Sequence, residues 1–197
     1  MFVTFEGLDG SGKSTQAQLL VEALRAGGRD VVAAREPGGT PLGEQLRDIL
    51  LNGVDMSPWA EAALFAAARA ELVERVIAPA LQAGKDVVCD RYIDSSLAYQ
   101  GIARDLGVDR VLELNLHATR GLLPDRTFLV LVDPAAALAR ASTTDRIERE
   151  SEEFHRAVDG AYRALAEMFP NRIDTVDGEQ PPVVIAREIH GRARELS

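Results

Sequence analysis

The stretch "FEGLDGSGKST" (residues 5–15) follows a short apolar run at the start of the chain and precedes an Ala/Leu/Gln-rich segment. Gly7, Gly12, Lys13 and Ser14 fit the pattern G-x-x-x-x-G-K-[ST]. The glycines allow the backbone to curl so that successive N–H groups face one centre, and a following helix adds its positive N-terminus. This order of strand, loop and helix predicts a phosphate-binding loop for a nucleoside triphosphate.

The side chains of this loop have distinct expected tasks. Lys13 can reach the outer phosphates, and the Ser14 hydroxyl can ligate Mg²⁺. The alternative is a chance turn between a strand and a helix. The residues predicted to bind the nucleotide are Gly7, Leu8, Asp9, Gly10, Ser11, Gly12, Lys13, Ser14 and Thr15.

Short apolar runs alternate with helical patterns along the rest of the chain. Strands are predicted at 2–5, 30–34, 86–90, 127–132 and 172–176. Helices are predicted at 13–26, 41–51, 58–83, 94–121 with a break near Gly107, 134–141, 151–168 and 181–195. Several strands lack polar alternation, as strands buried on both faces do. We therefore expect a P-loop three-layer α/β/α fold with a five-stranded parallel sheet.

The composition narrows the class of protein. One domain over residues 1–197 is expected, and a net charge of -9 disfavours nucleic acid or anionic membrane as the main partner. The single cysteine excludes an intrachain disulfide, no Cys/His cluster has zinc-site spacing, and no apolar run reaches the ~18 residues of a membrane span. The start "MFVTFEG" is unlike a signal peptide, so a cytoplasmic location is predicted.

The stretch "REPGGT" (35–40) is expected at the carboxyl end of the second strand, where ligands of parallel sheets gather. Glu36 and the Pro-Gly-Gly turn can approach a ligand there, and Arg47 follows in the next helix. The alternative is a plain strand-to-helix loop.

The stretch "DRYIDSSLAYQG" (90–101) is expected at the end of the third strand. Asp90 is placed to hold Mg²⁺ or its water, and Arg91 to grip a transferring phosphoryl group. The alternative for this pair is a surface ion pair. Three side chains of the following helix share one face by their spacing: Ser96, Tyr99 and Gln100.

The stretch "ALFAAARAEL" (63–72) places Phe65 and Arg69 four residues apart, on one helix face among alanines. They either form a slot for an aromatic ring with an arginine at its edge, or are a core Phe and a solvated Arg. No asparagine begins the N-K-x-D segment of a GTPase, because Gly, Leu and Arg follow the three asparagines. A nucleotide or nucleoside kinase and an ATPase switch remain open.

Together these stretches resemble the bacterial thymidylate kinases, P-loop nucleoside monophosphate kinases. The resemblance extends over nearly the whole chain and rests on "FEGLDGSGKST", "REPGGT", "LFAAAR", "DRYIDSSLAYQG" and "DRIE". It implies an enzyme that transfers the γ-phosphoryl of ATP to dTMP with Mg²⁺, giving dTDP and ADP. It also implies a homodimer. The other possibilities are a kinase for another nucleotide or nucleoside and a P-loop ATPase switch.

The resemblance also assigns the acceptor site. It implies that Phe65 stacks on thymine, that Arg69 donates to the thymine O4, and that Tyr99 lies under the sugar. Ser96 and Gln100 line the base edge. Four further residues lie near the sugar and the acceptor phosphate: Asp9, Glu36, Arg47 and Arg91.

The polar segment at about 141–150 is the expected lid. Gly10 stands where eukaryotic members carry a catalytic arginine, so the resemblance implies that a lid arginine takes this task. The candidates are Arg140, Arg146 and Arg149. We expect the segment to have no apolar stripe to bury and to be poorly ordered without ATP. The expected catalytic residues are Lys13, Asp9, Arg91, Arg140 and Arg146.

Overall fold

The computed structural model describes residues 1–140 and 145–196. Its centre is a sheet in the order β2-β3-β1-β4-β5, in which every neighbouring pair runs parallel. The strands are β1 (Phe2–Glu6), β2 (Val31–Arg35), β3 (Asp86–Asp90), β4 (Arg126–Leu131) and β5 (Ile173–Asp177). Each strand begins and ends within one residue of the predicted range, so the expected parallel sheet is confirmed.

The place of each strand in the sheet explains its burial. Every residue of the central strand β1 is buried, because helices cover both faces and strands flank both edges. The edge strand β2 alternates between more and less exposed residues. The apolar runs that predicted strands without alternation are therefore those of the sheet interior.

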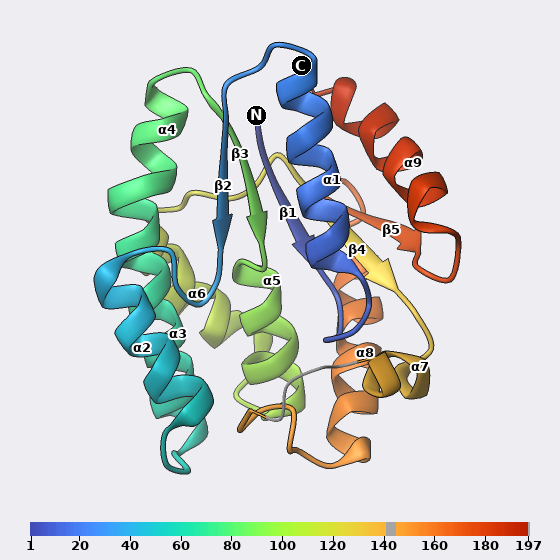
Figure 1. Cartoon of the computed structure of the whole chain (residues 1–197). Coiled ribbons are helices and arrows are strands. Elements are labelled where there is room, and N and C mark those ends of the chain that lie inside the picture. The colour runs from blue at the N-terminus through green and yellow to red at the C-terminus, as the bar shows by residue number, and fades with distance from the viewer. Residues whose placement is uncertain (141–144, 197) are drawn as a thin grey trace.

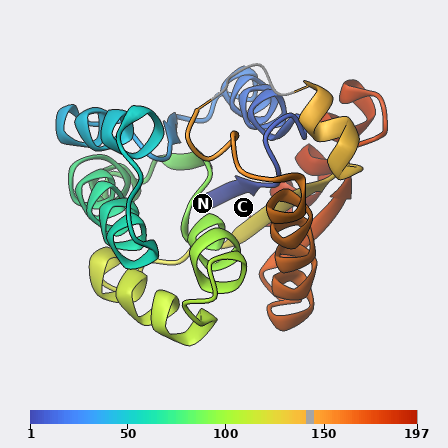
Figure 2. The ribbon, with the colours of Figure 1, turned by 90° about the horizontal axis from the view of Figure 1, so that it is seen from below.

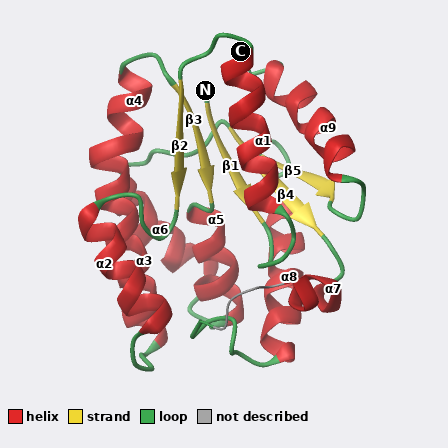
Figure 3. Ribbon diagram, in the orientation of Figure 1, coloured by secondary structure: helices red, strands yellow, loops and turns green. Residues whose placement is uncertain are grey.

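Two layers of helices enclose the sheet (Figures 1 and 3). On one face, α1 (Lys13–Ala26) packs against α9 (Pro182–Arg194), and both contribute to a core cluster with β1 and β4. The other face carries α6 (Val108–Thr119) and α8 (Glu152–Met168), together with the segment around α5 (Ile93–Ser96). Figure 2 shows the sheet between these two layers. The remaining helices are α2 (Pro41–Asn52), α3 (Pro58–Leu72), α4 (Ala78–Gln82) and α7 (Pro134–Arg140).

Two predicted helices contain π-helical turns, which the sequence did not indicate. The predicted helix 58–83 is α3, the π turn η1 (Val73–Ile77) and α4 in succession. The predicted helix 94–121 is α5, η2 (Leu97–Ala103) and, after the confirmed break at Gly107, α6. In η2 the N–H of Arg104 donates to Tyr99 O at 2.9 Å, a bond between residues five apart. π turns of this kind are frequent at functional sites.

Among the helices of the described residues, none combines the length and the apolar character that a bilayer crossing requires.

Candidate active site

The loop after β1 forms at the carboxyl edge of the sheet. Gly7, Gly10 and Gly12 all have positive φ angles, of 141°, 80° and 91°. A Cβ at Gly7 would lie 2.5 Å from Val130 O, so only glycine fits between the loop and β4. Helix α1 begins at Lys13 directly after the loop, which points the N-terminus of the helix into it.

Three charged side chains meet inside this loop. Lys13 Nζ donates to Asp9 Oδ1 at 2.8 Å and Arg91 Nη2 donates to the same oxygen at 2.7 Å. Burial alone would raise the pKa of Asp9, but the charges of Arg91 and Lys13 hold it below its usual value. Burial and the nearby Arg91 lower the pKa of Lys13. The arginine that follows β3 and the lysine at the start of α1 therefore share one carboxylate.

Arg91 is held from several sides. Its backbone is left-handed, with a φ of 66°. Its Nη1 donates to Ser95 Oγ at 3.0 Å and to Tyr162 OH at 3.1 Å. Both hydroxyls in turn donate to Glu6 Oε2, Ser95 at 2.6 Å and Tyr162 at 3.0 Å. Because each hydroxyl sends its proton to Glu6, both present lone pairs to Arg91.

Glu6 is a fully buried carboxylate at the end of β1. Its Oε1 accepts the backbone N–H groups of Tyr92 and Ser95, at 2.8 and 3.2 Å, which ties the start of α5 to the central strand. Burial and the charge of Asp94 raise its pKa to about 7, against the opposing effect of Arg91.

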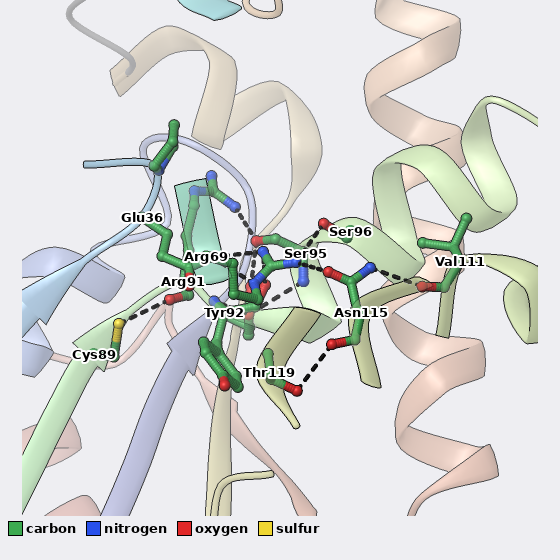
Figure 4. Close-up of polar contacts among 12 residues, drawn as sticks. Glu36, Arg69, Cys89, Arg91, Tyr92, Ser95, Ser96, Val111, Asn115 and Thr119 are labelled. Carbon is green, nitrogen blue, oxygen red and sulfur yellow. Dashed lines mark hydrogen bonds and ion pairs between the residues drawn. The ribbon is translucent and has the colours of Figure 1, made fainter. Parts of the chain in front are cut away.

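Arg69 of α3 lies in a closed network (Figure 4). Its Nε and Nη2 contact Glu36 Oε2 at 2.7 and 2.6 Å, and Nη2 also donates to Tyr92 O at 2.9 Å. Its Nη1 donates to Ser96 Oγ at 2.9 Å and to Asn115 Oδ1. A guanidinium has five N–H donors. Four of them donate hydrogen bonds here, and Nη2 also forms an ion pair with Glu36. An acceptor on a bound base must share or displace one of these partners.

Glu36 is buried beside this network. Its Oε2 is taken by Arg69, whereas its Oε1 is buried without a hydrogen-bond partner among the described residues. Burial raises the pKa of Glu36, and Arg69 opposes that shift. Glu36 also lines the pocket described next, so its unpaired oxygen is an acceptor held next to that pocket.

A pocket at the carboxyl edge of the sheet brings the predicted acceptor residues together. Most of the predicted substrate side chains line it: Asp9, Glu36, Arg47, Phe65, Arg91, Ser96, Tyr99 and Gln100. Arg69 is not part of the lining and lies behind Glu36 and Ser96. Arg47 donates from Nη1 to Pro37 O at 2.9 Å, which holds it at the rim. Side chains from four separate stretches thus converge, although local spacing could not show this.

Ser14 and Asp90 line a second hollow, between α1 and the ends of β2 and β3. Asp90 Oδ1 is buried and has no hydrogen-bond partner in the part of the chain that the structure describes. The same residues contain no cluster of three or more His, Cys, Asp or Glu side chains suited to a metal. One carboxylate with an unpaired oxygen and one hydroxyl fit Mg²⁺, which keeps several of its waters.

The segment predicted as a lid is only partly described, since residues 141–144 lie outside the described residues. The expectation that it buries nothing apolar is wrong at Ile147, which is 7% exposed and lies in the core cluster with Tyr99 and Tyr162. Arg140 ends α7 on the surface, where its Nη2 lies 3.3 Å from Glu179 Oε2.

Arg146 differs from its expected catalytic placement. It is buried, its Nε donates to Leu50 O at 2.9 Å, and its Nη2 donates to Glu61 Oε2 at 2.7 Å. These bonds direct the guanidinium toward α2 and α3, so in this structure Arg146 anchors the segment. Arg149 is exposed.

The sequence reasoning missed several residues that hold the site in place. Glu6 carried a signal, because a carboxylate inside the buried run "FVTFE" is rare unless it has partners. Asn115 and Tyr162 carried none, since polar and aromatic residues are ordinary in such helices. Their contacts with Arg69 and Arg91 join elements far apart in the chain.

The thymidylate kinase family model matches residues 5–189. The chain belongs to the thymidylate kinase family. A thymidylate kinase of a Synechococcus species is 49% identical over 189 residues, which cover 96% of this chain and 92% of the relative. A thymidylate kinase of an Exiguobacterium species is 47% identical over 194 residues, with the same coverage. The crystal structure of thymidylate kinase from Ehrlichia chaffeensis superposes with a TM-score of 0.83 at 33% identity, over 98% of both chains.

As a thymidylate kinase the chain is an ATP-dependent dTMP kinase, and the fold expected from the sequence is confirmed. The comparisons do not favour a kinase for another substrate or an ATPase switch.

Proposed function

We propose that the pocket at the carboxyl edge of the sheet holds dTMP, that the loop after β1 holds ATP, and that Asp9 stands between them. The observation that carries this proposal is the pairing of Asp9 with both Lys13 and Arg91. A transferring phosphoryl group must lie between a donor and an acceptor. The two cations that would neutralise it already converge here.

On the base side, Phe65 offers the ring on which thymine stacks, and Ser96 and Gln100 offer polar groups to its edge. Arg69 sets the Ser96 hydroxyl by donating to its oxygen, which leaves the Ser96 proton to donate to a base acceptor such as O4. Arg69 contacts O4 itself by sharing one of its N–H groups. Tyr99 closes the pocket where the sugar lies.

On the phosphate side, little covalent chemistry is required of the protein, because charge on the transferring group is spread over its oxygens. Lys13 and Arg91 exchange Asp9 for phosphate oxygens, and Arg47 holds the acceptor phosphate at the rim. Bound Mg²⁺ would supply further neutralisation of the phosphates, with Ser14 and Asp90 as its protein-side partners. Asp9, once released, and the unpaired oxygen of Glu36 accept hydroxyls of the sugar or of bound water.

Arg140 is the lid arginine of this proposal. Its ion pair with Glu179 joins two half-exposed side chains, and such pairs contribute little stability, so a phosphate can displace it. We also propose a cytoplasmic homodimer. Exposed apolar side chains on α2, the loop after it and the start of α3, namely Leu42, Ile49, Val54 and Trp59, support a face for a second copy. Light scattering would measure the mass in solution.

ADP release measured with and without dTMP tests the proposal. A dTMP kinase releases ADP at a rate that depends on dTMP and forms dTDP in equal amount. Release of ADP at the same rate without dTMP would identify an ATPase switch instead.

A further inference from the structure

Glu61 is a buried carboxylate that neither the nucleotide loop nor the proposed acceptor contacts use. It lies in the first turn of α3 with 1% of its surface exposed. Three side chains donate to it, and with them it forms what we call the Glu61 cluster: Glu61, Gln100, Arg104 and Arg146. The cluster joins α3 to η2 and to residues 145–150, whose chain runs below the ends of the strands in Figure 1.

The two oxygens of Glu61 have different partners. Oε1 accepts from Gln100 Nε2 at 2.8 Å, whereas Oε2 accepts from Arg146 Nη2 at 2.7 Å. Arg104 contacts both oxygens at 3.3–3.4 Å. Burial alone would raise the pKa of Glu61, but the bonds from Gln100 and Arg146 and the charges of both arginines lower it. Glu61 is therefore ionised at neutral pH and can only accept hydrogen bonds.

An acceptor-only partner fixes the orientation of the Gln100 amide. The NH₂ end must face Glu61, because the carbonyl end would set oxygen against oxygen. Gln100 also lines the acceptor pocket. Among the described residues, no group donates to its Oε1. The carbonyl is thus the end of the amide left for a ligand in the pocket.

We propose that Glu61 is a positioning residue for base specificity: it holds the Gln100 amide so that the pocket is offered a carbonyl acceptor. This inference rests on the proposed dTMP site. The N3 of thymine carries a hydrogen and donates, whereas the N3 of cytosine is an acceptor. A carbonyl at Gln100 pairs with thymine and opposes cytosine, so Glu61 contributes to the choice of base without contacting it.

The substitution Glu61→Gln tests this because it changes which end of the Gln100 amide must face position 61. Arg104 and Arg146 are donors only, so they take the single carbonyl oxygen of an amide at position 61. The NH₂ group introduced there then faces Gln100, whose amide must turn over and present its own NH₂ to the pocket. We expect the ratio of kcat/KM for dTMP to that for dCMP to fall roughly tenfold or more. The reason is that cytosine gains a matched partner for its N3, whereas thymine loses the acceptor for its N3–H.

A matched control separates this effect from anchoring of the segment 145–150. Glu150 accepts from Arg104 at 2.6 Å and does not contact Gln100. Glu150→Gln removes a negative charge that pairs with Arg104. It should leave the ratio of kcat/KM for dTMP to that for dCMP unchanged. If Glu61→Gln lowers kcat/KM for both monophosphates by the same factor, Glu61 is an anchor only and the proposal is overturned.

The double variant Glu61→Gln/Gln100→Glu covers the case in which the single variant fails to fold. It exchanges the two groups and keeps one negative charge and one amide in the cluster. The carboxylate at position 100 can only accept, so preference for dTMP should stay within about threefold of wild type. Loss of that preference in a folded double variant would contradict the proposal. The wild-type ratio is a separate result: if it does not favour dTMP, the proposed function fails, whatever the variants do.

Discussion

The base side and the phosphate side of the pocket use arginine in opposite ways. On the base side, Arg69 is 1% exposed, and its guanidinium makes four hydrogen bonds and an ion pair with protein partners, including Glu36, Ser96 and Asn115. On the phosphate side, Arg91 and Lys13 converge on Asp9, whose side chain is 36% exposed. Arg69 is paired with buried protein groups when the chain folds. Arg91 is instead paired with Asp9, a group that a phosphate can replace.

This difference indicates where specificity and catalysis reside. A buried and extensively hydrogen-bonded network is rigid, and breaking it leaves buried polar groups without partners, so it defines one shape for the base. Cations held by a half-exposed carboxylate stay available, and a phosphate that displaces Asp9 finds them already in position. Substitutions on the base side should act mainly on stability and substrate choice. Substitutions on the phosphate side should act mainly on turnover.

The largest expected effect is on stability. Arg69→Met leaves Glu36 buried without its partner, which should lower the free energy of unfolding by about 3–5 kcal/mol in urea titrations. The control is Arg35→Met, whose ion pair with Glu44 is half exposed. That substitution should cost less than about 1 kcal/mol. Equal losses in the two variants would contradict the contrast between buried and exposed arginines.

Lys13→Ala should act on turnover with little effect on stability. Losing one preorganised contact to the phosphates typically costs ~3–4 kcal/mol of transition-state stabilisation, or roughly 10²–10³ in kcat. Steady-state ADP release would measure it, with Lys85→Ala as the control because Lys85 pairs with exposed Asp30. Near-normal turnover in Lys13→Ala would mean that the loop is not the donor site.

The next effect depends on pH and involves Glu6. Its pKa is about 7 in the folded protein, against 4.5 as the ordinary value. Between these values the folded state holds a proton that the unfolded state has lost. The contribution of Glu6 is therefore greatest below pH 4.5 and is lost as the pH rises through 7, by up to about 3 kcal/mol.

Thermal unfolding of wild type and Glu6→Gln across this pH range measures that contribution, because glutamine does not titrate. The stability of wild type relative to the variant should decrease from pH 4.5 to 7. A difference that is constant or increases with pH would show that Glu6 is ionised throughout.

Arg140→Gln should have the smallest effect. We expect kcat to fall roughly two- to fivefold with KM for dTMP almost unchanged, as for a charge that stays partly solvated. Arg163→Gln is the control, since Arg163 pairs with Asp159 on the surface of α8. If Arg140→Gln keeps full turnover, Arg91 supplies the charge without help from the lid.

The sequence predicted the strands and the pocket residues better than the side-chain contacts that hold those residues in place. The apolar runs carry local signals, so the strands were predicted, and the motifs shared with the thymidylate kinases named most residues that line the pocket. The contacts that hold those residues carry no local signal. Asn115 meets Arg69 from α6, 46 positions along the chain, and Tyr162 meets Arg91 from α8, 71 positions along.

The segment predicted as a lid shows that the available hydrogen-bond partners decide whether an arginine is buried or exposed. Arg146 was expected to act on phosphates because the resemblance implies a lid arginine where the P-loop carries Gly10. It is buried because Glu61 and Leu50 O supply acceptors for it, and Ile147 follows it into the core. No pattern within residues 141–150 shows these partners, which lie on or beside α2 and α3.

Steady-state kinetics of the wild-type enzyme with dTMP, dUMP and dCMP test the central claim most directly. The base side as described predicts the order dTMP, then dUMP, then dCMP in kcat/KM. Loss of the 5-methyl should cost only ~1 kcal/mol, whereas the mismatched edge of cytosine should cost roughly 10- to 100-fold. Use of dCMP as efficient as that of dTMP would contradict the account, because a preorganised network of donors and acceptors cannot treat the two bases alike.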